Sequence, residues 1–340
     1  MIAAAVQAAG GLVPLLAGLA VAFAVFVYII LDGADLGTGM LFCLVGDARQ
    51  RGAMADTLLP VWDANETWLV LAGGGMFAMF PTAFAVLLTA LYLPMITMLL
   101  ALACRGVALA YRGEAKGRRK SWLDIVLCGG SCAAGFCQGV ILGAVIHGLP
   151  LGADPYSGGF AWFSAFALMC GLGLMVGYAG LGACWLAWRT TKPLAVRARL
   201  LAAVFGTATV FVLIALGLWT LQLNPAYPQR WQAMLHAGFG FVPALLLVIS
   251  ALGLSGAIAA RREFLPLLAT LGIFASGFLA IGITIFPDIV PPSLKIANAA
   301  AARATQVFVL WGYIVLIPAI LIYSTFAFVM FREKINADQN

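Results

Sequence analysis

The chain has 340 residues, of which 64% are hydrophobic and only 9% are charged. Soluble globular domains carry about 25% charged residues, so this composition excludes a soluble enzyme and indicates an integral membrane protein. The formal net charge of +6 does not call for a nucleic-acid partner, because the basic residues gather in the loops expected on one side of the membrane.

Nine apolar segments are long enough to cross a bilayer, which takes about 20 helical residues. We therefore expect an all-α, polytopic membrane protein with about nine transmembrane helices, forming a single integral membrane domain over residues 1–340. Only Phe80, Pro81 and Thr82 separate the second and third segments, which predicts a tight helical hairpin there. The expected spans are 12–31, 58–80, 82–106, 123–146, 160–188, 200–222, 238–260, 264–286 and 306–331.

The basic residues predict how these spans are oriented. If the amino terminus lies outside, the inner segments hold all of the 19 lysine and arginine residues except Arg230, Lys295 and Arg303. Cytoplasmic loops carry an excess of Lys and Arg, so we expect the amino terminus outside and the carboxyl terminus inside. No Lys or Arg precedes Asp32, whereas a signal peptide begins with a basic region; the first segment is therefore expected to be a transmembrane helix.

Cysteine and histidine form no recognisable metal or redox motif. The seven cysteines include no CxxC pair, and we expect them to be small buried apolar side chains rather than a disulfide framework. The two histidines, His147 and His236, lie near the predicted outer face. They are too few for a multihaem protein, which needs several axial ligands. We expect no metal site here, and any haem in another chain.

Four acidic residues lie where the first span ends and the second begins. Asp32 and Asp35 follow the first span in LDGADLGTGM, and Asp63 and Glu66 open the second in PVWDANETW. A charge at a bilayer centre costs about 2.5–3.5 kcal/mol on insertion scales, so acids within a membrane are candidates for function. At 1.5 Å per residue, Glu66 is expected roughly 12 Å along its helix. The third span ends at Arg105, a natural counter-charge.

Two interpretations of these acids remain open. In the first, they are hydrated near the membrane surface, Asp32 at a helix end, and Arg105 lowers the cost of burying one of them. In the second, Asp63 and Glu66 share one helical face, and a carboxyl there exchanges protons with the cytoplasm, as a proton-uptake path requires. The candidate pathway residues are Asp35, Asp63, Glu66 and Arg105.

Trp62 and Trp68 flank the second acidic pair. They are candidates for contact with a quinone or with a partner chain. Tryptophan is, however, more commonly an anchor at the membrane interface. Both interpretations stay open.

Several motifs resemble subunit II of cytochrome bd-type quinol oxidases, particularly the cyanide-insensitive branch. They are LDGADLGTGM, PVWDANETWLVLAGGGMFAMFP and CRGVALAYR, with further agreement in QGVILGAVIHG, FPDIVPPSL and PAILIYSTFAFVMFREK. The resemblance covers nearly the whole chain and implies a respiratory terminal oxidase of the bacterial cytoplasmic (inner) membrane. Such enzymes oxidise quinol, reduce dioxygen to water and take protons from the cytoplasm.

The resemblance also implies that two subunits have different components and roles. Subunit II would form two four-helix bundles plus a peripheral helix, bind no haem and contain no catalytic residue, whereas subunit I would hold haem b and haem d. A bound quinone, small single-helix subunits and surrounding lipid are further expected components. Asp63 matches an aspartate of a polar channel leading toward the haems, and Asp35 and Arg105 match polar positions at its cytoplasmic side.

The chain departs from the family pattern at a few positions. Ala110 stands where relatives commonly carry an acid, so one channel carboxylate is missing, and Glu66, where some relatives carry Gln, is a partial replacement. His147 replaces a residue that is often Gln, and Ala297-Asn298 stands where many relatives read Trp-Asp. These departures indicate a divergent branch of the family, and an oxidase with haem b in place of haem d stays open as an alternative.

Two other functions are alternatives to the oxidase. A proton-coupled secondary transporter is the alternative from another class, but transporters place their sites near the bilayer midplane in repeated halves. Here the acids cluster in the first third of the chain, and the fifth to seventh spans contain none. A purely structural assembly subunit differs from the oxidase prediction only if the acids are dispensable.

Overall fold

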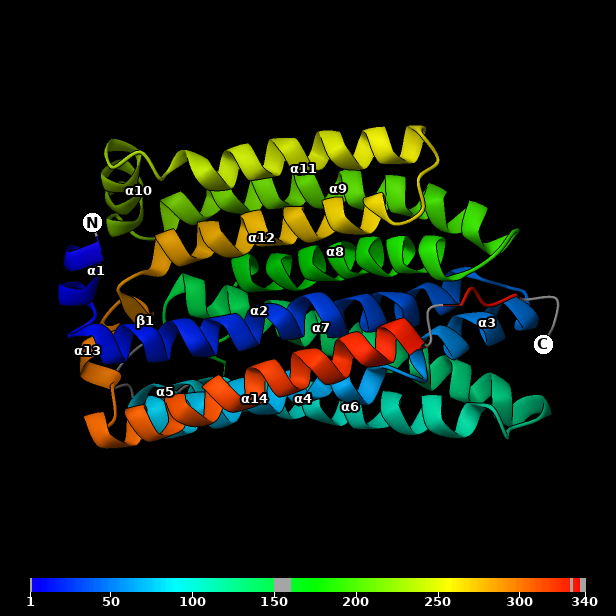
Figure 1. Ribbon diagram of the computed structural model, residues 1–340, viewed down its shortest axis with the longest axis horizontal. Coiled ribbons are helices and arrows are strands. Elements are labelled where there is room, and N and C mark those ends of the chain that lie inside the picture. The colour runs from blue at the N-terminus through cyan, green and yellow to red at the C-terminus, as the bar shows by residue number, and fades with distance from the viewer. Residues whose placement is uncertain (1, 150–159, 331–332, 337–340) are drawn as a thin grey trace.

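The computed structural model describes residues 2–149, 160–330 and 333–336, and long helices run side by side along its longest axis (Figure 1). Among the described residues, eight helices are long and apolar enough to span a membrane, and a bent pair, α4 (Trp62–Met79) with α5 (Pro81–Ala90), would be a ninth. The all-α, polytopic prediction is confirmed. The eight are α2 (Leu12–Leu41, extended in the span by the 3-10 turn η1, Phe42–Leu44), α6 (Tyr92–Arg112), α7 (Gly117–His147), α8 (Ala165–Arg189), α9 (Leu194–Leu223), α11 (Phe241–Ala259), α12 (Leu265–Ile285) and α14 (Arg303–Met330).

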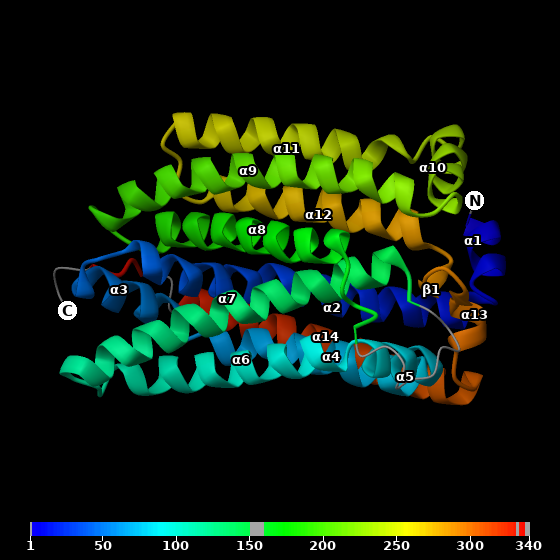
Figure 2. The ribbon, with the colours of Figure 1, turned by 180° about the vertical axis from the view of Figure 1, so that it is seen from behind.

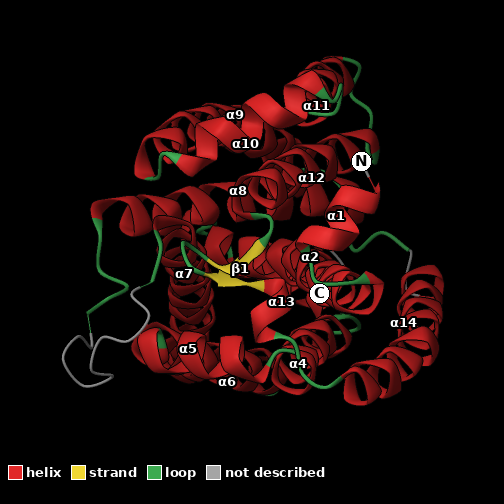
Figure 3. Ribbon diagram, turned by 90° about the vertical axis from the view of Figure 1, so that its left-hand side faces the viewer, coloured by secondary structure: helices red, strands yellow, loops and turns green. Residues whose placement is uncertain are grey.

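The spanning helices form two groups of four and one peripheral helix, as expected. The first group is α2, α4, α6 and α7, the second is α8, α9, α11 and α12, and α2 and α7 pack on α8 where the groups meet. Helix α14 packs on α2 and α4, and the end view shows it at the edge of the molecule (Figure 3). Gly37 of α2 and Gly182 of α8 lie backbone to backbone at the junction, because a Cβ on either would overlap the opposite main chain.

Short elements gather at the two ends of the helices (Figures 1 and 2). At the predicted outer end lie α1 (Ile2–Ala8), α10 (Ala226–His236), the antiparallel strands β1 (Asp288–Val290) and β2 (Leu294–Lys295), and α13 (Ile296–Ala299). Arg230 of α10 donates to Asp288 at 2.6 Å and to two carbonyls at the end of α12, which fastens α10 to β1. At the opposite, predicted cytoplasmic end lies α3 (Ala48–Leu58).

The prediction of a tight helical hairpin between the second and third spans is wrong. Phe80 leaves the helical conformation, and α5 then starts at Pro81, lying at 119° to α4. Proline is favoured at the first position of a helix because it has no backbone N–H to leave unpaired. Helix α5 therefore carries the chain sideways from α4 before α6 begins at Tyr92.

Two further expectations need correction. Helix α2 continues to Leu41, so Asp32 and Asp35 lie inside a helix and not after its end. Cys43 and Cys128 form a disulfide, which spacing in the sequence did not indicate because the two residues are 85 positions apart. The last expected span ends at residue 331, outside the described residues.

Candidate functional site

Asp32 and Asp35 lie on α2 in the interior of the molecule, 0% and 2% exposed. The glycines around them explain why: a Cβ on Gly33 would overlap the Tyr178 ring, and Gly37 meets the α8 backbone. Because α2 approaches α8 closely here, both carboxylates are enclosed by protein. The interpretation of Asp32 as a hydrated helix-end residue is wrong.

Arg105 of α6 lies between three carboxylates and is fully buried. Its Nη1 donates to Asp32 Oδ1 and to Glu66 Oε1, both at 3.0 Å. Its Nη2 lies 3.7 Å from Asp35 Oδ2. The structure thus brings together three of the four predicted pathway residues, Asp35, Glu66 and Arg105, and adds Asp32. We call these four residues the acid cluster.

The charge of the acid cluster does not balance. One guanidinium faces three carboxyl groups, and an uncompensated charge is expensive in a region of low dielectric constant. Protons bound to the carboxyl groups would remove the excess. The arrangement is therefore suited to taking up and passing on protons.

Asn65 of α4 completes the acid cluster on the Asp35 side. Its Nδ2 donates to Asp35 Oδ2 at 2.8 Å, and the residue is 2% exposed. Its Oδ1, together with Asp32 Oδ2 and Arg105 Nη2, is buried and has no hydrogen-bond partner among the described residues. The two oxygens can each accept a further hydrogen bond and Arg105 Nη2 can donate one, so water can bind at these atoms.

Asp63 does not join the acid cluster. It lies in the first turn of α4, is exposed, and forms no ion pair with any described residue. The Glu66 side chain, three positions later, is only 26% exposed. The prediction that the two share one buried face is wrong: residues three apart point about 60° apart around a helix, enough to place one inside and the other outside.

The two tryptophans beside the acids pack within the chain. Trp68 is fully buried and meets Phe23 edge to face, with ring centroids 6.0 Å apart. Trp62 is half-buried and lies against Gly106, whose missing side chain makes room for the indole. Their contact with a quinone stays a prediction.

Three polar side chains beside the acid cluster were missed by the sequence analysis. Gln138 Nε2 donates to the Tyr28 hydroxyl, and the Tyr178 hydroxyl donates to Gln138 Oε1, both at 2.6 Å. Tyr28 in turn interacts with the Asp32 carboxylate. Their signal in the sequence was their polarity within apolar spans, since polar side chains there pair with one another across helices.

A second charged group lies at the predicted cytoplasmic end, apart from the predicted site. Asp124 accepts from Arg51 Nε at 2.9 Å and from Arg112 Nε at 2.5 Å. Nearby on α3, burial raises the pKa of Asp56, while Arg112 and Lys120 oppose the rise. This group ties α3 to α6 and α7.

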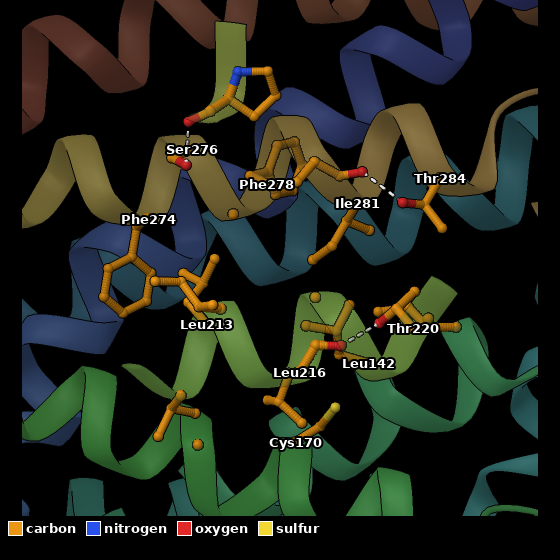
Figure 4. Close-up of a pocket in the computed structure, with 18 of the residues that line it drawn as sticks. Leu142, Cys170, Leu213, Leu216, Thr220, Phe274, Ser276, Phe278, Ile281 and Thr284 are labelled. Carbon is orange, nitrogen blue, oxygen red and sulfur yellow. Dashed lines mark hydrogen bonds between the residues drawn. The ribbon is translucent and has the colours of Figure 1, made fainter. Parts of the chain in front are cut away.

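A cavity of about 440 Å³ lies mainly among α8, α9, α11 and α12 (Figure 4). Its walls are apolar, and the hydroxyls of Thr220, Ser276 and Thr284 are bonded to backbone carbonyls. None of the predicted site residues lines it. Among the described residues there is also no group of three or more His, Cys, Asp or Glu that could hold a metal ion.

Comparison with known proteins agrees with this architecture. Residues 13–331 match the family model for cytochrome bd terminal oxidase subunit II. The chain is 27% identical over 339 residues to the cytochrome bd-I ubiquinol oxidase subunit 2 of Escherichia coli (strain K12), covering 88% of this chain and 89% of that protein. It is 27% identical over 325 residues to the cytochrome bd ubiquinol oxidase subunit 2 of Bacillus subtilis (strain 168), covering 91% and 93%.

A solved structure shares the fold. A chain in the structure of bd oxidase from Geobacillus thermodenitrificans matches with a TM-score of 0.77 at 17% identity, covering 94% of this chain and 98% of that one. The family match extends over nearly the whole length of the sequence. The chain belongs to the cytochrome bd terminal oxidase subunit II family.

Proposed function

We propose that this chain, as subunit II of a bd-type terminal oxidase, conducts protons from the cytoplasm toward a haem-bearing subunit I in a bacterial inner membrane. The complex would oxidise quinol and reduce dioxygen to water, a reaction that consumes protons. The observation that carries the proposal is the acid cluster: one buried arginine shared by three carboxyl groups from two neighbouring helices. Acids within a membrane commonly mark ion or proton pathways.

The geometry supports a sequence of proton transfers across the chain. Asp35 and Glu66 both interact with Arg105. A proton released by the Asp35 carboxyl can therefore be taken up by the Glu66 carboxylate through a bridging water, while the Arg105 guanidinium moves toward the newly ionised Asp35. Glu66 is partly exposed and close enough to Asp63 for the two charges to interact. Asp63 is the last carboxyl of this series and the most accessible.

The exposed face of α4 is proposed to meet subunit I. It carries Asp63, Thr67, Val70 and Phe77, with Val70 73% and Phe77 62% exposed. An acid on a spanning helix is costly against lipid, so coverage by another protein chain would explain why Asp63 is tolerated. A proton leaving Glu66 and Asp63 would then pass to that subunit.

We assign the haems to subunit I, because the described part of this chain offers no buried histidine to ligate them. Both histidines are exposed, and His236 Nδ1 lies 2.6 Å from the carbonyl oxygen of Gln232 on its own helix. Haem b with haem d, or haem b in its place, is expected in subunit I. A bound quinone and small single-helix subunits remain expected components of the complex.

The described helices give little support to a proton-coupled transporter. The second group of helices holds the cavity of about 440 Å³, yet no acid lines it. Its hydroxyls are bonded to backbone carbonyls. A transporter site would need polar groups there to bind its substrate.

The substitution Asp35→Asn in the assembled oxidase tests the proposal. It removes an exchangeable proton but preserves size, and we expect quinol-driven oxygen consumption to fall at least about tenfold, since a positioned proton-transfer group commonly contributes more than that. The exposed loop substitution Glu114→Gln is the matched control and should leave turnover unchanged. Full turnover of Asp35→Asn with normal haem absorption would reduce this chain to an assembly role.

A further inference from the structure

A second cavity, of about 260 Å³, reaches the acid cluster from the side. It lies between α2, α8 and α12, and Asp35 and Asn65 form its polar end. Asp32 does not line it. The other lining residues are Ile30, Leu31, Ala34, Trp185, Trp188, Phe264, Leu267 and Leu271.

The polar end of this cavity is equipped to hold water. A water molecule occupies about 30 Å³ in the liquid and needs two to four polar partners when buried. Asp35 offers carboxylate oxygens, and Asn65 Oδ1 is buried without a hydrogen-bond partner among the described residues. Water at this position would touch Asp35 before any other carboxyl of the acid cluster.

The other end of the cavity lies near the predicted cytoplasmic surface. Trp188 is in the last turn of α8, and Phe264 immediately precedes α12, two residues after Arg262. Their ring centroids are 4.9 Å apart, and Phe264 is 42% exposed. This aromatic pair therefore lines the end of the cavity nearest the predicted cytoplasmic surface, and Phe264 already faces outward.

We propose that protons enter the acid cluster through this cavity, passing Trp188 and Phe264 and binding first to Asp35. A hydronium ion in the cavity would transfer one proton to the Asp35 carboxylate and remain as water. This inference rests on the proposed function and identifies the entrance of the proposed proton pathway. It also explains how the chain manages without an acid at Ala110, because that position is on α6 and does not line the cavity.

Filling the cavity tests the entrance. Ala34 lines it and is 7% exposed, so Ala34→Leu adds three carbons directly beside Asp35. We expect oxygen consumption by the intact complex to fall several-fold with unchanged haem absorption. The matched control is Ala280→Leu, which adds the same atoms to the larger apolar cavity and should leave turnover unchanged.

Thiol labelling tests the same entrance independently of turnover. Leu267→Cys places a thiol in the wall of the cavity. With a membrane-impermeant thiol reagent, we expect labelling above the background of the parent complex in inside-out vesicles and not in right-side-out vesicles. Ala280→Cys, in the larger cavity, should stay at background in both.

The outcomes separate the entrance from the proposed function. If Asp35→Asn lowers turnover but Ala34→Leu does not, and Leu267→Cys stays unlabelled from the cytoplasmic side, the entrance is wrong and the proton pathway stands. If neither Asp35→Asn nor Ala34→Leu lowers turnover, the proton pathway itself is wrong. Should Ala34→Leu fail to assemble, the labelling of Leu267→Cys decides.

Discussion

At the scale of single residues, Arg105 determines how the acids are arranged. It is fully buried, and its two terminal nitrogens face carboxyl groups from both α2 and α4. A buried ion pair costs desolvation energy that its attraction repays only with good geometry, so it is weak evidence for stability. Three acids facing one base are the observation on which the proposed proton pathway rests.

The chain of hydrogen bonds beside Asp32 has a direction. The Tyr178 hydroxyl donates to Gln138, and Gln138 donates to Tyr28, so the hydroxyl hydrogen of Tyr28 is free to point at Asp32. A neutral amide passes protons poorly, because it holds its hydrogens on nitrogen. We therefore expect these hydrogen bonds to hold Asp32 in place rather than to conduct protons.

Removing one member of this hydrogen-bonded trio should cost more than removing all three. Tyr28→Phe leaves Gln138 Nε2 without its acceptor, which should lower the free energy of unfolding by about 1–3 kcal/mol. Adding Gln138→Leu and Tyr178→Phe removes the stranded donor together with the Tyr178 hydroxyl that donates to Gln138, and should restore part of the loss. Thermal unfolding of the purified complex measures both variants; additive losses in the triple variant would contradict the coupling.

At the scale of elements, helix α3, at the predicted cytoplasmic end, makes the stability of the protein depend on pH. Asp56 lies on α3 about half-buried, and the same burial raises its pKa above the ordinary value of 3.8. The folded state therefore disfavours the ionised form. The resulting penalty is absent at pH values below the unfolded pKa, where both states are protonated, grows as the pH rises from the unfolded pKa to the raised pKa, and is complete above it.

Asp56→Asn should therefore stabilise the protein at neutral pH. The asparagine cannot ionise, so the melting temperature of the variant should exceed that of the parent at pH 7. The difference should shrink as the pH falls toward the ordinary pKa of 3.8, because the unfolded carboxyl then becomes protonated as well. Melting curves over this range provide the check, and a difference that grows on acidification would contradict the sign.

At the scale of the whole molecule, the exposed face of α4 and the two groups of helices suggest where subunit I binds. Asp63 and Val70 lie on the same exposed side of α4. Lipid accepts a large apolar side chain, whereas a packed protein interface does not. This difference distinguishes a lipid-facing surface from one that subunit I covers.

Val70→Trp should therefore weaken assembly with subunit I. The control is Val204→Trp on α9, where the parent valine is also exposed, at 56%, but lies in the other group of helices. Recovery of haem with affinity-tagged chain from mild detergent is the measurement. Equal recovery for the two variants would place the partner elsewhere.

The particular residues show how far the sequence could predict the site. LDGADLGTGM and PVWDANETW located the acids correctly, and the charge at Arg105 identified their counter-ion. The sequence could not place Asp63 outside and Asp32 inside, because that depends on how α4 and α2 are rotated about their axes. It also missed Gln138 and its tyrosine partners, which lie on three different helices.

The sequence by itself determined the class of protein, the approximate number of spans and the family, because apolar length and local motifs are properties of the chain taken a short stretch at a time. Tertiary structure alone decided that Arg105 meets three carboxyl groups, that Cys43 and Cys128 join, and that a cavity opens on Asp35. In a soluble protein, the polar face of a helix reveals how it is rotated. A spanning helix is apolar toward lipid and toward its neighbours alike, so its rotation is set by close packing, which no short stretch of sequence records.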